Sequence, residues 1–359
     1  MRVTIVGGGN VGTQFAVHCA SKGMETIVFS SKAEEFQKKL EISDENGNIT
    51  LTAEIAGATY DCEKAFSKAD LIFITTPAFC AVDIFEKVAP YVKKGAHIGL
   101  IPGTGGMECV FKPCLDKGCV LFGLQRVPSV ARLVNYGQRV CAVGYRNQLH
   151  VASLPGTEAP NCAKLVEDIF DIPCATLPNY LNITLTPSNP ILHTTRLYSI
   201  FRDYCQGKSY DSVPLFYEGW DNQSSAILLS CDVEVQKIKS ALINFDLTGV
   251  RSLKEHYESQ TEQQLTDKIR SIQGFKGLTT PSKQIDGKYY PDFSSRYFVA
   301  DFSYGLEILK QIAEFAGVET PNINKVMQWY RNLRPDEKSF KYSDYGISDY
   351  KTFAAFYCR

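Results

Sequence analysis

The sequence has no long hydrophobic run, and none of its apolar stretches approaches the about 18 residues that a membrane-spanning helix requires. Residues 1–6 are a short β-branched run without the charged and apolar regions of a secretory signal peptide. We therefore expect no membrane partner and a cytoplasmic location.

An excess of charge of one sign is also missing. Lys and Arg number 38 against 39 Asp and Glu, which gives a formal net charge of −1. A protein that binds nucleic acid through a generally basic surface carries a clear excess of Lys and Arg. We expect no nucleic-acid partner, although the balance leaves a local basic patch open.

Paired cysteines are absent as well. The 12 cysteines include no Cys-x-x-Cys pair and no cluster with histidine at the spacing of a zinc site. In a chain of 359 residues this scatter indicates reduced, mostly buried thiols of a cytosolic protein. We expect no metal site.

The chain is 44% hydrophobic and 21% charged, which is typical of a globular protein. Its length of 359 residues favours two domains. In residues 1–180, short apolar runs alternate with helical patterns, which predicts an α/β domain with a Rossmann-type, doubly wound parallel sheet. Strands are expected at 2–6, 25–29, 48–54, 71–76, 96–101, 120–124, 139–144, 149–153 and 174–177.

Helical periodicity dominates after the expected boundary near 178–185, which predicts an all-α C-terminal domain, residues 181–359. Residues 275–300 are rich in Gly and Pro and predict a long loop. The aromatic tail from residue 334 is expected to pack on the body of the protein. Helices are expected at about 190–206, 223–244, 249–272, 303–317 and 321–332.

A glycine motif, Gly7-x-Gly9-x-x-Gly12, follows the first predicted strand and opens a predicted helix, which is the setting of a dinucleotide-binding loop. Gly7 permits the tight turn, Gly9 lets the backbone approach a pyrophosphate, and Gly12 lets the helix pack on the strand. The helix N-terminus, with Asn10 and Val11, offers N–H groups to the phosphates. The alternative is a tight turn without a ligand.

The second predicted strand ends in Ser30-Ser31-Lys32, where an NAD site normally has an Asp or Glu for the ribose 2′-hydroxyl. Two hydroxyls and an ammonium suit a 2′-phosphate better, so the pattern favours NADP(H) over NAD(H). The alternative is that Ser30 or Ser31 caps the next helix and Lys32 is solvated.

Another predicted strand ends at Thr76 and Pro77. Ligands of open α/β sheets bind at the carboxyl ends of the strands, so both residues are expected on the nicotinamide side of the cofactor. Ordinary turn chemistry explains them equally well.

In the second half, Asn189 and Pro190 are typical first residues of a helix, which puts His193 one turn into it. An isolated histidine here is more often structural. If Asp301 meets His193 in space, its carboxylate orients the imidazole as a general acid and base. Otherwise Asp301 and Ser303 are candidate N-caps of the helix that follows.

Together with residues 124–128, Arg132 and the segments 216–220 and 296–306, these features resemble the octopine/nopaline (opine) dehydrogenase family over nearly the whole chain. The resemblance implies an N-terminal Rossmann domain, a C-terminal helical domain and an active site in the cleft between them. It also implies reductive joining of an amino acid to a 2-oxo acid, commonly pyruvate, with NADH or NADPH.

The resemblance further implies that His193 is the catalytic histidine and Asp301 the aspartate paired with it. Arg296 matches an arginine that binds a substrate carboxylate, and Gln125 matches a glutamine that faces the substrate. Asn189 either positions substrate or only caps its helix.

One departure from the family is the missing acidic residue at 30–32. Two other functions stay open: a simple 2-oxo or 3-hydroxy acid reductase, whose expected lysine is absent near His193, and a non-catalytic NAD(P)-binding sensor. Relatives that build metal-chelating opines form a third variant. The residues leave open which amino acid and 2-oxo acid react, the stereochemistry and direction of the reaction, and the oligomeric state, a homodimer included.

Overall fold

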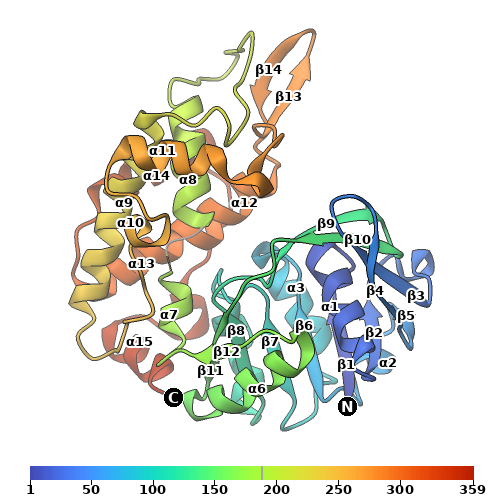
Figure 1. Ribbon diagram of the computed structural model, residues 1–359. Helices are drawn as coiled ribbons and strands as arrows, with labels where there is room; N and C mark the ends of the chain where they lie inside the picture. Colours follow the sequence, from blue (N-terminus) through green and yellow to red (C-terminus); the bar gives the residue numbers. More distant parts are fainter. Residues whose placement is uncertain (187–188) are drawn as a thin grey trace. The chain divides into compact units, whose positions relative to one another are not determined.

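The computed structural model describes residues 1–186 and 189–359 and divides the chain into two compact units (Figure 1). Unit 1 is Met1–Thr184 together with Ala355–Arg359, and unit 2 is Leu185–Ala354. The division falls slightly after the boundary expected at 180, and the last residues of the chain return to unit 1. None of the helices in the described ranges has the length and apolar character that crossing a membrane requires.

Unit 1 is built on an eight-stranded sheet in the order β12-β11-β8-β7-β6-β1-β2-β5. The strands from β8 to β5 run parallel, whereas β11 is antiparallel to β8. The expected doubly wound sheet therefore forms, with a reversed edge. Its strands are β1 (Arg2–Val6), β2 (Glu25–Phe29), β5 (Gly57–Thr59), β6 (Leu71–Ile74), β7 (His97–Leu100), β8 (Val120–Leu124), β11 (Leu149–Leu154) and β12 (Cys174–Thr176).

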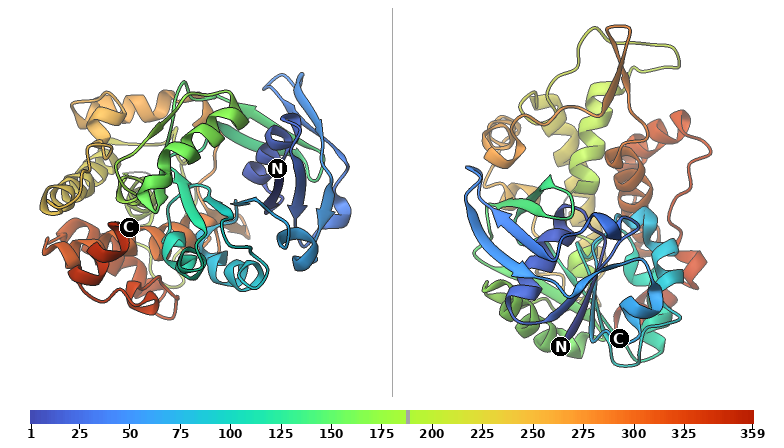
Figure 2. Two further views of the ribbon diagram at one scale, coloured as in Figure 1. Left: turned by 90° about the horizontal axis from the view of Figure 1, so that it is seen from below. Right: turned by 90° about the vertical axis from the view of Figure 1, so that its right-hand side faces the viewer.

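Helices cover both faces of this sheet (Figure 2), which is why residues of its central strand β6 are all buried. The helices α1 (Asn10–Ser21) and α6 (Ala159–Phe170) contact each other on one face. On the other face α2 (Cys62–Phe66), α3 (Ala81–Val88), α4 (Met107–Val110) and α5 (Lys112–Asp116) follow one another. The short α7 (Leu181–Thr184) ends the main segment of unit 1.

A second sheet, in the order β4-β3-β10-β9, packs on the other side of α1. Its strands are β3 (Lys39–Ser43), β4 (Ile49–Glu54), β9 (Val130–Asn135) and β10 (Arg139–Val143). The strands expected at 48–54 and 139–144 do form, but in this sheet rather than in the parallel one. The exposed faces of β4 and β9 show that the sheet is buried on one side only, as antiparallel pairs allow.

One buried carboxyl group fastens two distant parts of unit 1. Glu108, on α4, is fully buried and accepts hydrogen bonds from Thr184 Oγ1 at 3.1 Å and from Tyr357 Oη at 2.7 Å. Thr184 ends the main segment of the unit, and Tyr357 belongs to the returning C-terminus. The aromatic tail therefore packs on the body of the protein, as its composition predicts, and burial raises the pKa of Glu108.

Unit 2 is mainly helical, with two differences from expectation. The helix predicted at 249–272 is two helices, because Thr261 begins a new one with a capping box. The loop predicted at 275–300 contains a hairpin whose Asp286-Gly287 turn has positive φ at both residues, the type I′ geometry, and which projects from the helices of unit 2 (Figure 1). The elements are α8 (Asn189–Phe201), α9 (Asn222–Ala241), α10 (Leu253–His256), α11 (Glu262–Ser271), β13 (Ser282–Ile285), β14 (Lys288–Pro291), α12 (Arg296–Asp301), α13 (Glu307–Ala316) and α14 (Pro321–Leu333). The last helix, α15 (Tyr350–Tyr357), begins in unit 2 and ends in unit 1.

Candidate active site

The glycine loop joins β1 to α1 at the carboxyl edge of the main sheet. Gly7 has a φ of +105°, which favours glycine. A Cβ atom on Gly12 would lie 1.9 Å from the carbonyl oxygen of Gly7, so only glycine lets α1 pack there. A Cβ atom on Gly9 would meet no atom of the described residues within 4 Å. Packing therefore explains Gly12 but not Gly9, and the open backbone at Gly9 fits the approach of a dinucleotide pyrophosphate.

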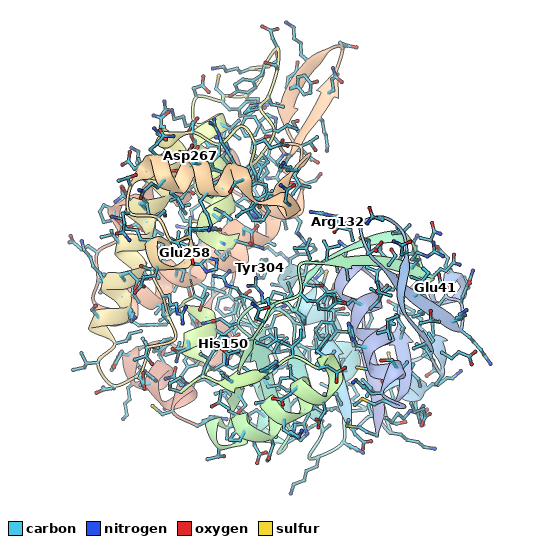
Figure 3. All side chains as sticks on the ribbon, viewed as in Figure 1. Glu41, Arg132, His150, Glu258, Asp267 and Tyr304 are labelled. Carbon is cyan, nitrogen blue, oxygen red and sulfur yellow. The ribbon has the colours of Figure 1, made fainter. Side chains whose placement is uncertain are left out.

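The first residues of α1 have distinct surroundings. Asn10 is exposed, and its side-chain oxygen accepts a hydrogen bond of 2.8 Å from the backbone N–H of Leu133, on β9. Val11 is half-buried. The Asn10 side chain thus connects the loop to the second sheet, whose residues Glu41 and Arg132 are labelled in Figure 3. The backbone N–H groups at the start of α1 are suited to bind a phosphate.

The end of β2 is covered by a tyrosine that sequence reasoning missed. Ser30 is buried, and its hydroxyl lies 2.8 Å from Tyr136 Oη and accepts a hydrogen bond from the Lys32 backbone N–H at 3.1 Å. Ser31 is exposed, and Lys32 forms an exposed ion pair of 3.2 Å with Glu35. Tyr136 comes from the turn between β9 and β10, too far along the chain for local pattern to show.

Thr76 and Pro77 follow β6 beside the glycine loop. The Thr76 hydroxyl oxygen is buried and has no hydrogen-bond partner among the described residues, whereas the neighbouring Thr75 hydroxyl donates to the Val6 carbonyl at 2.8 Å. A buried hydroxyl without a protein partner suits a ligand at this edge. Pro77, half-buried, starts the next turn. The residues present therefore fit a nicotinamide dinucleotide.

In unit 2, His193 and Asp301 meet. His193 is 3% exposed, and its Nδ1 atom lies 2.7 Å from Asp301 Oδ2. Its Nε2 atom lies 2.7 Å from the hydroxyl of Tyr217, and the ring of Tyr297 stacks on the imidazole with centroids 4.1 Å apart. A carboxylate on one ring nitrogen and a hydroxyl on the other is the arrangement of a general acid and base.

Local packing explains why these two residues meet. Asp301 ends α12 and is followed by a π-helical segment, Phe302–Leu306, that continues directly into α13. A Cβ atom on Gly305 would lie 2.7 Å from atoms of the Pro190 ring, so glycine lets the start of α8 approach this segment. His193 is one turn further along α8. Neither Asp301 nor Ser303 starts a helix with a side-chain cap, so the capping interpretation is wrong.

Arg196, on the same helix as His193, holds the segment that carries Tyr217. It is 1% exposed and donates hydrogen bonds to the carbonyls of Phe216 at 2.9 Å and Gly219 at 2.5 Å. Burial lowers the pKa of its guanidinium to about 10. Arg196 therefore stays charged near neutral pH and stabilises the turn at residues 216–219 through these hydrogen bonds. From the sequence alone, its position predicts only that it shares a helix face with His193.

Other residues implied by the resemblance lie as follows. Arg296 is exposed at the start of α12 and forms no ion pair with any described residue, so its guanidinium is available to a carboxylate. Asn189 is exposed at the start of α8. Gln125, in unit 1, donates to the Asn182 carbonyl at 3.2 Å. Tyr304, labelled in Figure 3, belongs to the π-helical segment.

Tyr217 and Tyr297 both lie in segments that carry the resemblance, but the sequence assigns neither of them a definite role. Tyr297 and Asp301 are four residues apart in one helix, which places them on one face. This spacing is a sequence signal that Tyr297 lies beside the proposed catalytic aspartate. Tyr217 lies in the segment 216–220, which carries part of the resemblance, but its contact with His193 depends on the fold of that segment and does not follow from the pattern.

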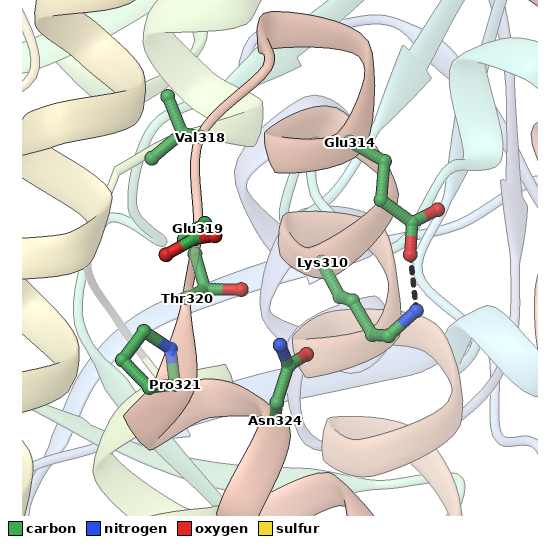
Figure 4. Close-up of a pocket in the computed structure, with 7 residues that line it drawn as sticks. All are labelled: Lys310, Glu314, Val318, Glu319, Thr320, Pro321 and Asn324. Carbon is green, nitrogen blue, oxygen red and sulfur yellow. Dashed lines mark hydrogen bonds and ion pairs between the residues drawn. The ribbon is translucent and has the colours of Figure 1, made fainter.

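A shallow pocket of about 350 Å³ also lies in unit 2, between α13 and α14 (Figure 4). None of the predicted site residues lines it, and an ion pair between Lys310 and Glu314 spans its rim. Among residues 1–186 and 189–359, no group of three or more His, Cys, Asp or Glu gathers as a metal site would require. The pocket is lined by Lys310, Glu314, Val318, Glu319, Thr320, Pro321 and Asn324.

The chain is similar to known dehydrogenases. Residues 176–334 match the alpha-helical domain of NAD/NADP octopine/nopaline dehydrogenase, and residues 2–108 match the N-terminus of NAD-dependent glycerol-3-phosphate dehydrogenase. The chain is 29% identical to tauropine dehydrogenase from Arabella iricolor over 93% of its own length and 92% of the relative's. It is 27% identical to octopine dehydrogenase from Pecten maximus over 92% and 89%.

A solved structure of octopine dehydrogenase with NADH and L-arginine has the same fold, with a TM-score of 0.84, 24% identity and coverage of 99% and 98% of the two chains. The fold and the matches define an NAD(P)-dependent oxidoreductase. The resemblance predicted from the sequence is confirmed: the alpha-helical domain of the octopine/nopaline dehydrogenases matches residues 176–334, and the similarity to tauropine and octopine dehydrogenases covers most of the chain.

Proposed function

We propose that the protein is an opine dehydrogenase that joins the amine of an amino acid to the carbonyl carbon of a 2-oxo acid such as pyruvate. The observation that carries this proposal is the buried His193–Asp301 pair, in a chain whose relatives are tauropine and octopine dehydrogenases. Bound NAD(P)H supplies the hydride that reduces the imine carbon.

The condensation needs one group that acts as base and then as acid. An amino acid arrives as an ammonium ion and must lose a proton before its nitrogen attacks the 2-oxo carbon. The resulting carbinolamine must gain a proton on its hydroxyl, which then leaves as water. His193 takes the first proton and returns it, while the Asp301 carboxylate accepts from Nδ1–H and stabilises the imidazolium.

Substrate carboxylates are assigned to Arg296, whose exposed guanidinium can hold one in a bidentate contact. Gln125 and Asn189 are proposed as further substrate-binding residues. Both substrates carry a carboxylate, so an arginine that pairs with no carboxylate in residues 1–186 and 189–359 suits either.

The cofactor is proposed to be NADPH in preference to NADH, bound by Gly7, Gly9, Gly12 and the backbone of residues 10–11. Ser31 and Lys32 are exposed at the end of β2, where the 2′-phosphate would lie. The Lys32–Glu35 ion pair is exposed, and such pairs contribute only about 0–1 kcal/mol. A phosphate dianion can therefore displace Glu35. Ser30, Thr76 and Pro77 complete the proposed site.

We also propose a reducing, cytoplasmic location, because all 12 cysteines are free thiols. A homodimer is proposed as the assembly state to be tested by light scattering of the purified protein.

The reaction is tested by following NADPH and NADH absorbance with pyruvate and a panel of amino acids, each with and without the amine. Oxidation that requires both the amine and the 2-oxo acid is expected. Oxidation with pyruvate alone would instead identify a simple reductase, and cofactor binding without turnover on any pair would favour a sensor.

A further inference from the structure

Both ring nitrogens of His193 are already engaged by protein atoms. Nδ1 lies 2.7 Å from Asp301 Oδ2, and Nε2 lies 2.7 Å from the hydroxyl of Tyr217. The pairing with Asp301 leaves Nε2 as the nitrogen that can exchange a proton with a substrate. That nitrogen faces Tyr217.

The imidazole is also enclosed on its other sides. Tyr297 stacks on one face at 4.1 Å and 16°, and Phe216 packs edge-on with centroids 5.7 Å apart. Only 3% of His193 is exposed. In this arrangement the hydroxyl of Tyr217 occupies the hydrogen-bonding position at Nε2.

Several independent contacts hold Tyr217 in place. Its ring stacks on Phe275 with centroids 4.0 Å apart, and its own exposure is 3%. The residues on either side of it in the turn, Phe216 and Gly219, receive hydrogen bonds from the buried Arg196. A Cβ atom on Gly219 would lie 2.5 Å from Pro214, so the tight turn requires glycine.

A phenol is chemically suited to pass a proton on, because it can donate and accept a hydrogen bond at the same oxygen. Toward a neutral imidazole its O–H donates to Nε2, and toward an imidazolium its oxygen accepts from Nε2–H. Burial raises the pKa of Tyr217 well above its usual value, and the nearby Tyr297 raises it further. The hydroxyl therefore keeps its proton at rest and is not a phenolate.

We propose that the Tyr217 hydroxyl is the relay through which His193 exchanges protons with the reacting amine and oxygen. This inference rests on the proposed function. The substrate ammonium gives a proton to the Tyr217 oxygen as the phenolic proton passes to Nε2, so the amine becomes free to attack the 2-oxo carbon.

The amine then attacks the 2-oxo carbon, the C=O π bond breaks, and one nitrogen proton moves to the resulting alkoxide, which gives the neutral carbinolamine. In the second half of the step the relayed protons move the other way. The phenolic proton passes to the carbinolamine hydroxyl, the C–O bond breaks, and water leaves. The Nε2 proton replaces the one that the phenol has given. The nitrogen lone pair forms the C=N bond, so ammonium and 2-oxo acid have become iminium and water, and His193 and Tyr217 are restored.

The test is Tyr217→Phe, which keeps the ring on Phe275 and removes only the hydroxyl. The relay predicts that kcat falls by about 10²–10⁴-fold, the range of general acid–base catalysis, with little change in KM. It also predicts a curved dependence of the wild-type rate on the deuterium fraction of the solvent, since two protons move together. The matched control is Tyr342→Phe, a buried tyrosine of unit 2 among Phe340 and Phe353, which is expected to keep both kcat and the curvature.

A second readout does not depend on turnover. With ¹⁵N-labelled histidine, Tyr217→Phe is expected to shift the Nε2 resonance of His193 and to leave the Nδ1 resonance nearly unchanged. A wild-type kcat in Tyr217→Phe, while His193→Ala is inactive, would overturn the relay but leave the proposed function intact. An unmoved Nε2 resonance would also overturn the relay. A wild-type enzyme that oxidises cofactor without an amine would contradict the proposed function itself.

Discussion

Asp301 Oδ2 lies 2.7 Å from His193 Nδ1, although 108 positions separate the two residues in the chain. The contact depends on the π-helical segment that follows Asp301 and on Gly305, which lets Pro190 approach. The segment that carries Tyr217 then closes the other side of the imidazole. Backbone geometry in two helices therefore assembles the proposed acid–base group.

Replacing Asp301 with asparagine is expected to lower kcat by about 10²–10⁴-fold, because the amide no longer holds the Nδ1–H tautomer or stabilises the imidazolium. Steady-state kinetics at saturating cofactor measures this. The control Asp292→Asn changes a carboxylate that pairs with Lys283 in the same unit and should keep full activity. Near-normal turnover of Asp301→Asn would show that the pair is only structural.

Two glycines of the nucleotide loop should respond differently to alanine. Gly12→Ala places a Cβ atom 1.9 Å from a backbone oxygen, so it is expected to lower the unfolding temperature or prevent folding. Gly9→Ala has room within the protein and should keep the unfolding temperature, but a methyl group facing the pyrophosphate should weaken NAD(P)H binding about tenfold or more.

Thermal unfolding and cofactor titration separate the two effects. Gly156→Ala serves as the control, because its Cβ atom would lie 3.4 Å from the Arg359 carbonyl oxygen, an ordinary van der Waals contact. Unchanged cofactor affinity in Gly9→Ala would argue against a pyrophosphate at this backbone.

Lys32→Glu tests the preference for NADPH. Loss of one charge-assisted hydrogen bond, about 1.5–3 kcal/mol, corresponds to about ten- to hundredfold in kcat/KM for NADPH. The kcat/KM for NADH should change little or rise. Lys38→Glu, an exposed lysine in the same region, is the charge-matched control. An equal fall with both cofactors would refute the assignment of Lys32 to the 2′-phosphate.

Asp232 predicts a specific pH dependence of stability. Burial raises its pKa from 3.8 to about 6, although it accepts a hydrogen bond from the Leu253 backbone N–H at 2.8 Å. The folded state therefore binds the proton more tightly than the unfolded state. The stabilisation from the protonated carboxyl is full below about pH 4 and is lost as pH rises through about 6.

Asp232→Asn should remove this contribution. Between pH 4 and pH 7 the wild-type unfolding temperature is expected to fall relative to that of the variant, as thermal unfolding at several pH values will measure. A constant difference between the two proteins across this range would show that Asp232 does not titrate there.

The sequence predicts the parallel sheet, the glycine loop and the helical second half because each depends on local periodicity or a short motif. The second sheet does not follow from pattern, since β4 and β10 look like any half-buried strands and their partners are set by packing over α1. The hairpin at 282–291 had a local signal, Asp286-Gly287, inside a segment that its glycines and prolines indicate as a loop.

The candidate site, like the fold, is predicted by the sequence only in part. His193 and Asp301 follow from helix position and resemblance, and the structure shows the contact that makes them a pair. Tyr136 beside Ser30 and Tyr217 beside His193 come from turns far away in the sequence, so only the folded chain shows them.

Hydride transfer from deuterated cofactor tests the proposed reaction most directly. The protein is supplied with NADPH or NADH carrying deuterium at the transferred position, together with pyruvate and the amino acids, and the products are analysed by mass spectrometry. An opine dehydrogenase is expected to yield a secondary amine with one deuterium on the carbon that was the carbonyl of pyruvate. Deuterated lactate, formed equally well without amino acid, would contradict the proposed reaction.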